Sequence, residues 1–296
     1  MQRNMALGLG VIAGISFGTA AIFIRLLSML DSTSIAFARL FIGFLGLLVL
    51  LYFRREIKEF IHFAKSYSWK HIIMGALLGI HFIFFVASVQ HTTVLNATIF
   101  VNTTPIQALI ISVIFLKVKP SARDVFSVLL GFSGITLIAL SEAVVAGSDN
   151  ITGDIEALIA AGIIAVYLTI GADLRKETEA LVLMTSNFLL GALVIFFYSL
   201  PVQGGIFIPL ELSVILFLFG LGLIPTAIGH TLYVISVKVL KPYEIATITL
   251  LEALSATILA AILFSEIPSL FSVVGAVLIS IALLMLVRKK DFIQES

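Results

Sequence analysis

The stretch KPYEIATITLLEALSATILAAILFSE, residues 241–266, is long and apolar enough to cross a bilayer as a helix, yet it holds Glu252 near its middle. Thr249 and Ser255 stand one helical turn before and after this glutamate. A carboxylate at that depth costs about 2.5–3.5 kcal/mol on insertion scales, so its place is by default inside the protein. The pattern predicts a polar cavity lined by Glu252. In the alternative interpretation the carboxyl is neutral and only hydrogen-bonds a neighbouring helix, residues 94–116.

The whole chain has the composition of a polytopic membrane protein. Its 296 residues are 60% hydrophobic and only 12% charged, against about 25% charged residues in soluble domains. The mean hydropathy is +1.18. A net charge of +1 offers no basis for a nucleic-acid partner. Cysteine is absent, which excludes disulfides, thiolate metal sites and cysteine nucleophiles.

Ten apolar runs of about the 20 residues needed to span a bilayer follow one another along the chain. They lie at residues 6–24, 34–53, 72–90, 94–116, 125–140, 155–172, 181–200, 212–237, 243–264 and 270–287, of which 125–140 is short. The first has no A-x-A-type cleavage site, so we expect a helix and not a signal peptide. Lysine and arginine gather in alternate connections and at both termini, which places both termini in the cytoplasm. We therefore expect an all-α protein with ten transmembrane helices in the cytoplasmic (inner) membrane.

The longest cytoplasmic connection, RREIKEFIHFAKSYSWK at residues 54–70, sets Ile57, Phe60 and Ile61 among charged residues. This pattern predicts a short amphipathic helix in the headgroup region, with Trp69 at the interface. Binding of a partner is the alternative.

A shift of 148 residues aligns the two halves of the chain. It pairs Gly14 with Gly162, Gly43 with Gly191, Ala108 with Ala256, and Pro120-Ser121 with Pro268-Ser269. Each half, residues 1–148 and 149–296, then holds five helices, and an odd number gives the second half the opposite orientation in the membrane. Such inverted repeats are typical of secondary transporters, which bind substrate near the midplane and alternate access between the two sides.

Three short motifs accompany this plan: Ala38-Arg39-Leu40, the NTTPIQ stretch at residues 102–107, and LEAL at residues 251–254 followed by Glu266. Together with the inverted plan, they resemble the ten-helix, EamA-like type of the drug/metabolite transporter superfamily over nearly the whole chain. The resemblance implies transport of small metabolites, often efflux of amino acids or related compounds. Thr104, Ala253 and Val118 replace a glutamate, a proline and an acidic residue of the family pattern, so no particular substrate is implied.

Polar side chains inside the apolar runs indicate which helices line a cavity. Thr226, His230 and Tyr233 are spaced four and three apart, which places them on one helical face. An imidazole, which titrates near neutral pH, would suit proton transfer. Packing by a hydrogen bond is the alternative role for His230.

The run at residues 94–116 carries its polar groups around Pro105. Proline frees a backbone carbonyl near the midplane, where discontinuous helices of transporters bind substrate. A simple kink is the alternative. With the groups on other runs, the predicted substrate-binding set is Glu252, His230, Tyr233, Asn102, Gln107, Thr103, Thr104, His81, Tyr167 and Thr249.

Arg39 lies a little more than one turn inside the outer end of its run. It can snorkel to the interface, which we favour, or it can pair with a carboxylate and help to close an outer gate. Gly14 and Gly18 form a small-xxx-small pair that predicts close helix packing. The runs 125–140 and 270–287 carry almost only small polar residues and are predicted to be peripheral or dimer-forming, which leaves a homodimer open.

These observations predict a secondary transporter that moves a small organic solute, with Glu252 binding an amine or exchanging a proton. A passive facilitator or channel for small polar solutes is the alternative. No enzyme is expected, because the chain has no HExxH and its five histidines are scattered. No GxxxxGK[ST] phosphate loop indicates nucleotide-driven pumping, and no cofactor or metal is expected.

Overall fold

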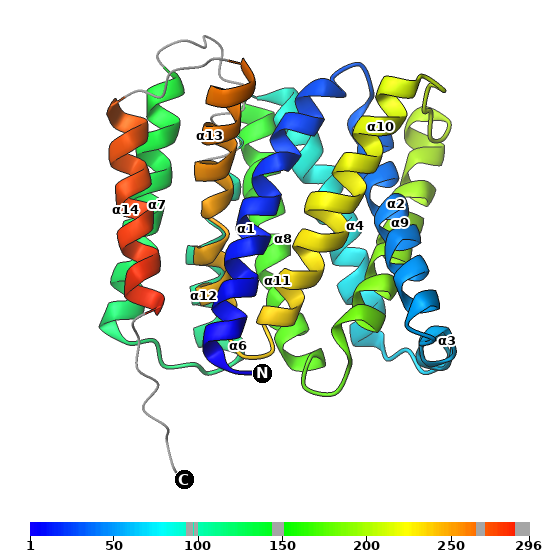
Figure 1. Ribbon diagram of the computed structural model, residues 1–296, viewed down its shortest axis with the longest axis horizontal. Helices are drawn as coiled ribbons and strands as arrows, with labels where there is room; N and C mark the ends of the chain where they lie inside the picture. Colours follow the sequence, from blue (N-terminus) through cyan, green and yellow to red (C-terminus); the bar gives the residue numbers. More distant parts are fainter. Residues whose placement is uncertain (93–96, 98–99, 144–150, 265–269, 288–296) are drawn as a thin grey trace.

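The computed structural model describes residues 1–92, 97, 100–143, 151–264 and 270–287, and every regular element in these ranges is a helix (Figure 1). Among the described residues, six segments are long and apolar enough to cross a membrane: α1 (Arg3–Leu26), α2 (Ser32–Phe53), α4 (Trp69–His91), α8 (Ile151–Leu174), α9 (Ala180–Gln203) and Leu212–Ser236. The last is made of α10 (Leu212–Leu221), η1 (Gly222–His230) and α11 (Thr231–Ser236). The other helices are α3 (Ile57–Lys65), α6 (Thr104–Phe115), α7 (Ala122–Ala143), α12 (Pro242–Ile248), α13 (Leu251–Phe264) and α14 (Leu270–Val287). The all-helical membrane class is confirmed, whereas the count of ten spans stays a prediction.

Most of the described helices begin and end close to the predicted limits, and α14 covers the predicted run 270–287. In the run 94–116, α6 begins only at Thr104, and residues 94–96 and 98–99 lie outside the described residues. The run at 125–140 differs, because α7 has 22 residues and is not short. Ser121 and Asp124 explain the early start: the Ser121 backbone N–H donates to Asp124 Oδ2 at 2.9 Å, and the Asp124 N–H donates to Ser121 Oγ at 3.2 Å. This reciprocal capping box satisfies two of the N–H groups that a helix leaves unpaired at its start. Glu266 and the pair Pro268-Ser269, which the motif and repeat analysis used, lie outside the described residues.

The amphipathic helix predicted within residues 54–70 is present as α3. Phe60 is its buried residue, whereas Lys58 and Glu59 are exposed. Trp69, which begins α4, is 65% exposed. The apolar side of α3 therefore packs on the bundle, and its charged side faces outward.

The helices stand side by side as a bundle, with α7 and α14 paired at one edge (Figure 1). Within the bundle α4 packs on α8 and α9, α2 packs on α9, and α1 packs on α13. The predicted close packing at Gly14 and Gly18 is found in the contact of α1 with α13. A Cβ atom on Gly18 would stand 2.8 Å from the Glu252 carbonyl oxygen, so only glycine allows the two backbones to approach this closely.

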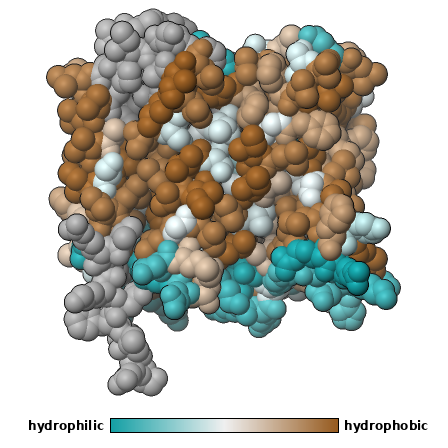
Figure 2. All heavy atoms as spheres, viewed as in Figure 1, coloured by the Kyte–Doolittle hydropathy of each residue, from teal (hydrophilic) through white to brown (hydrophobic). Residues whose placement is uncertain are grey.

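The visible face is apolar across its middle, and hydrophilic residues gather along the edge near the N-terminus and α3 (Figure 2). At this end Arg3 Nη2 lies 2.9 Å from Glu244 Oε1 and also donates to the Leu286 carbonyl at 3.3 Å. These contacts tie the start of α1 to α12 and to the end of α14.

Candidate functional site

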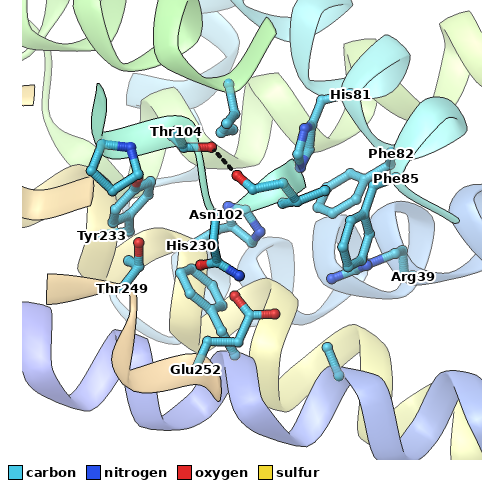
Figure 3. A pocket seen from close by; sticks show the side chains of 15 residues that line it. Arg39, His81, Phe82, Phe85, Asn102, Thr104, His230, Tyr233, Thr249 and Glu252 are labelled. Carbon is cyan, nitrogen blue, oxygen red and sulfur yellow. Dashed lines mark hydrogen bonds between the residues drawn. The ribbon is translucent and has the colours of Figure 1, made fainter. Parts of the chain in front are cut away.

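A cavity inside the bundle has an empty volume of about 580 Å³, its open mouth included. Residues from both halves of the chain line it: Phe17, Ala20, Arg39, His81, Phe82, Phe85, Val101, Asn102, Thr104, Pro105, Ile164, His230, Tyr233, Thr249 and Glu252. Seven of the predicted binding residues are in this set, namely Glu252, His230, Tyr233, Asn102, Thr104, His81 and Thr249. The half-buried Glu252 points into the cavity, and the side chain of Asn102 points toward it (Figure 3).

Two helix interruptions border the cavity. A turn at residues 102–103 precedes α6, whose first turn contains Pro105. The other interruption separates α12 from α13 at residues 249–250. The shift of 148 residues aligns Asn102 with Leu250 in the sequence, so the two interruptions occupy equivalent positions in the two halves. The discontinuity predicted around Pro105 is present, whereas the second was not predicted, because residues 243–264 contain neither proline nor glycine.

The hydroxyl groups at these interruptions bond to the local backbone. Thr104 Oγ1 donates to the Val101 carbonyl at 2.6 Å (Figure 3), and Thr249 Oγ1 donates to the Ala246 carbonyl at 2.7 Å. Carbonyl groups left over where a helix stops need partners inside a membrane. The threonines therefore stabilise the two interruptions next to the cavity.

Arg39 does not snorkel. It is 2% exposed, its Nε donates to Thr226 Oγ1 at 3.1 Å, and its guanidinium carbon lies 3.9 Å from the centre of the Phe82 ring. Stacking on an aromatic face and a hydroxyl acceptor replace part of the hydration that a buried guanidinium loses. The preference for snorkelling was wrong because the sequence did not show that α2 turns this position toward α4 and η1.

An unusual helix positions the acceptor of Arg39. In η1 the backbone winds as a π-helix over nine residues, with Pro225 inside it. Thr226 Oγ1 donates to the Leu221 carbonyl, five residues earlier, at 2.8 Å. π-Helical turns are rare and often mark functional sites. Here the π-helix places the Thr226 hydroxyl against Arg39, while His230 at its end lines the cavity, although regular spacing predicted that both residues lie on one helical face.

The two cavity histidines have different surroundings. His81 Nδ1 lies 2.9 Å from the Ala160 carbonyl oxygen, so this nitrogen carries a proton and donates it. His230 Nδ1 is buried and has no hydrogen-bond partner in the part of the chain that the structure describes. The His230 ring instead lies among aromatic rings, with centroids 4.7 Å from Phe17 and 5.2 Å from Phe82. His230 is therefore held by packing on aromatic rings and not by a hydrogen bond through Nδ1.

Three predicted binding residues lie outside the cavity lining. Gln107 Nε2 donates to Thr103 Oγ1 at 2.9 Å, which stabilises the start of α6. Tyr167 is fully buried, and its hydroxyl donates to Met184 Sδ at 3.2 Å. A role for these residues in binding substrate stays a prediction.

Sequence reasoning missed the apolar part of the lining. Phe17 and Phe82 contact the polar side chains of the site, and Ile164 also lines the cavity. Their only signal was hydrophobicity, which lipid-facing positions share. Among the described residues no group of three or more His, Cys, Asp or Glu could hold a metal ion.

Comparisons with known proteins agree with this architecture. The EamA-like transporter family matches the chain twice, at residues 4–140 and 151–288. Two proteins of Archaeoglobus fulgidus, both named uncharacterized transporters, are 23% identical over 263 and 279 residues. The first alignment covers 87% of this chain and 88% of the relative, and the second covers 94% and 95%. A solved crystal structure aligns over 96% of both chains with a TM-score of 0.83 and 16% identity, which shows a shared fold.

Proposed function

Because this chain belongs to the EamA-like transporter family, we propose that it is a secondary transporter that exports a small organic metabolite, an amino acid or a related solute, by alternating access. The membrane is the cytoplasmic one, with ten spans in two inverted five-helix repeats and both termini inside. The two family matches, at residues 4–140 and 151–288, support the division of the chain near residue 148.

The cavity between the two helix interruptions is the observation on which the proposal rests. Glu252 and Arg39 bring opposite charges to a small space lined by Phe17, Phe82 and Tyr233. Buried charges are expensive in a membrane protein, and they mark substrate or ion pathways. Interrupted helices at the midplane are the usual sites at which transporters bind substrate. Glu252 is the proposed anionic group, which binds an amine or exchanges a proton.

The interruptions also support alternating access. The break at residues 249–250 separates the short helices α12 and α13, which can tilt independently, and the turn before α6 occupies the corresponding position in the first half of the chain. Rocking of one repeat against the other around a central site requires such an arrangement. A channel requires no equivalent movement.

The first experiment identifies a solute. The purified chain is heated with amino acids, amines, nucleosides or organic anions, and a compound that binds the folded state raises Tm by mass action. The compound with the largest effect is then radiolabelled, and its flux is measured in proteoliposomes. We expect saturable flux that can be driven uphill by a gradient of the solute or of protons, whereas a passive channel would give neither saturation nor uphill movement.

The second experiment tests Glu252. Glu252→Gln removes the charge but keeps the shape of the side chain, and we expect flux to fall at least tenfold while the protein still folds. Glu211→Gln is the matched control, because Glu211 is exposed at the start of α10. Equal flux in Glu252→Gln and in the unmodified protein would contradict the proposed role.

A further inference from the structure

Arg39 holds an unused hydrogen-bond donor at the cavity. Its Nε is satisfied by Thr226, but its Nη1 is buried and has no partner among the described residues. A guanidinium has five N–H donors and cannot lose its charge in a protein. Burying a donor without an acceptor is destabilising, and more so when the donor is charged. Such a cost, in a residue that lines a cavity, points to a ligand with an acceptor.

His230 offers a second unused polar atom next to the same aromatic ring. Its Nδ1 has no partner, and its ring lies 5.2 Å from the Phe82 ring on which Arg39 stacks. Both side chains line the cavity and are at least nine-tenths buried, at 6% exposed for His230 and 2% for Arg39. Two independent polar groups therefore lack partners on one side of the cavity.

Glu252 is not the missing partner of Arg39. The side chains of Arg39 and Glu252, both among the described residues, form no ion pair within 4.0 Å, although their charges attract across the cavity. Figure 3 shows the carboxylate of Glu252 below Asn102 and the guanidinium of Arg39 to one side. The two charges are thus held apart by the packing of their own helices, with space between them.

We infer that Arg39 and His230 form an oxyanion subsite, which binds the carboxylate of the transported solute while Glu252 binds its ammonium group. This inference rests on the proposed function and deepens it, because it makes the solute a small zwitterion. A carboxylate matches the planar fork of a guanidinium and carries one charge. A phosphate carries nearly two charges, and the lining residues include no lysine to neutralise the second. The subsite therefore selects carboxylates.

The test compares three forms of one molecule on the full chain in detergent. Each amino acid of a panel is used with its methyl ester, which lacks the negative charge, and with its decarboxylated amine. We expect at least one amino acid to raise Tm, with Kd at least tenfold higher for its ester and its amine. Equal stabilisation by acid, ester and amine, or stabilisation by none of the panel, would overturn the inference.

A variant series assigns the effect to Arg39. Arg39→Gln should raise Kd for the amino acid at least tenfold but leave the weak affinity for its methyl ester unchanged. Arg123→Gln, at an exposed position at the start of α7, is the matched control and should change neither. If Arg39→Gln does not fold, Arg39→Lys keeps the charge, and it should still prefer acid to ester but bind the acid more weakly. Full affinity for the acid in both variants would overturn the inference.

These measurements separate the inference from the proposed function. Binding in detergent requires no flux, so the acid–ester difference can be present even if Glu252→Gln transports normally. Hydroxy acids without an amine provide the second distinction. If they bind as well as amino acids and lose affinity in Arg39→Gln, the oxyanion subsite holds while the ammonium role of Glu252 fails.

Discussion

Thr226 holds Arg39 through a hydroxyl group that both accepts and donates. It accepts from Arg39 Nε at 3.1 Å and donates to the Leu221 carbonyl at 2.8 Å. A residue with this pair of bonds positions the charged side chain without needing to touch a solute itself. Thr226 is accordingly absent from the cavity lining.

Thr226→Val keeps the shape of the side chain but removes its hydroxyl. We expect Tm to fall by several degrees, since a buried guanidinium donor loses its acceptor at about 1–3 kcal/mol. The affinity for a carboxylate solute should fall with it, because Arg39 gains freedom to move. Differential scanning fluorimetry and equilibrium binding measure the two effects.

Thr231→Val is the control for this prediction. Thr231 is also buried, but its hydroxyl has no hydrogen-bond partner. Removing an unsatisfied hydroxyl should leave Tm unchanged or raise it. Equal losses in the two variants would show that Thr226 has no special role.

At the scale of elements, the contact of α1 with α13 connects packing to the site. A Cβ atom on Gly18 would stand 2.0 Å from Ser255 Oγ and 2.8 Å from the Ala256 backbone nitrogen. Glu252 lies on the same helix as these atoms, within one turn of Ser255. The distance between α1 and α13 therefore controls where the carboxylate lies.

Gly18→Ala should push α13 away from α1. We expect a loss of about 1–3 kcal/mol in stability, as for other overpacked positions, and a fall in solute affinity as Glu252 is displaced. Gly8→Ala, in the same helix, has nothing within 4 Å of its added Cβ and should be neutral or slightly stabilising. Thermal denaturation of both variants decides: a Gly18→Ala protein as stable as Gly8→Ala would refute close packing at this contact.

Elements also show where prediction from sequence succeeded. Apolar runs and the amphipathic spacing in residues 54–70 predicted helices that the structure contains, because these signals are local. The Gly14–Gly18 pair predicted close helix packing, which the structure also contains. The π-helix at residues 222–230 and the interruption at 249–250 were not predicted from the sequence. Pro225 and the nearby glycines hinted at the first, but whether a proline kinks, widens or ends a helix depends on the neighbours that satisfy its freed carbonyl.

At the scale of the whole molecule, an ion pair connects the first helix, α1, to α12. Glu244 is 1% exposed, and its Oε2 accepts from the Lys241 backbone N–H at 2.9 Å while Oε1 faces Arg3 Nη2, also at 2.9 Å. Arg3 in turn reaches the carbonyl of Leu286. At the end of the molecule near the N-terminus, one buried carboxylate thus joins the start of α1 to the start of α12.

Glu244→Gln should lower the thermal stability of the purified protein. Removing one charge of a fully buried pair costs about 3–5 kcal/mol, and the partial exposure of Arg3 lowers our expectation to roughly 2 kcal/mol. Lys176→Gln is the control, because Lys176 is 72% exposed in its pair with Asp173, and exposed pairs contribute about 0–1 kcal/mol. Denaturation at low and at high salt distinguishes the two, since salt weakens only the exposed pair. A Tm for Glu244→Gln within one degree of the control would contradict a stabilising role for this end of the bundle.

The sequence alone determined that this chain is a helical membrane protein, with helices close to their observed limits and Glu252 as an internal carboxylate. Those conclusions rest on hydrophobicity and on the cost of burying charge, which any single span expresses by itself. Only the tertiary structure decided that Arg39 points inward, that Thr226 holds it, and that the Phe82 ring contacts both Arg39 and His230. These facts depend on how each helix is rotated about its axis. That rotation is set by close packing against neighbouring helices, such as α1 on α13 at Gly18, which no single helix encodes.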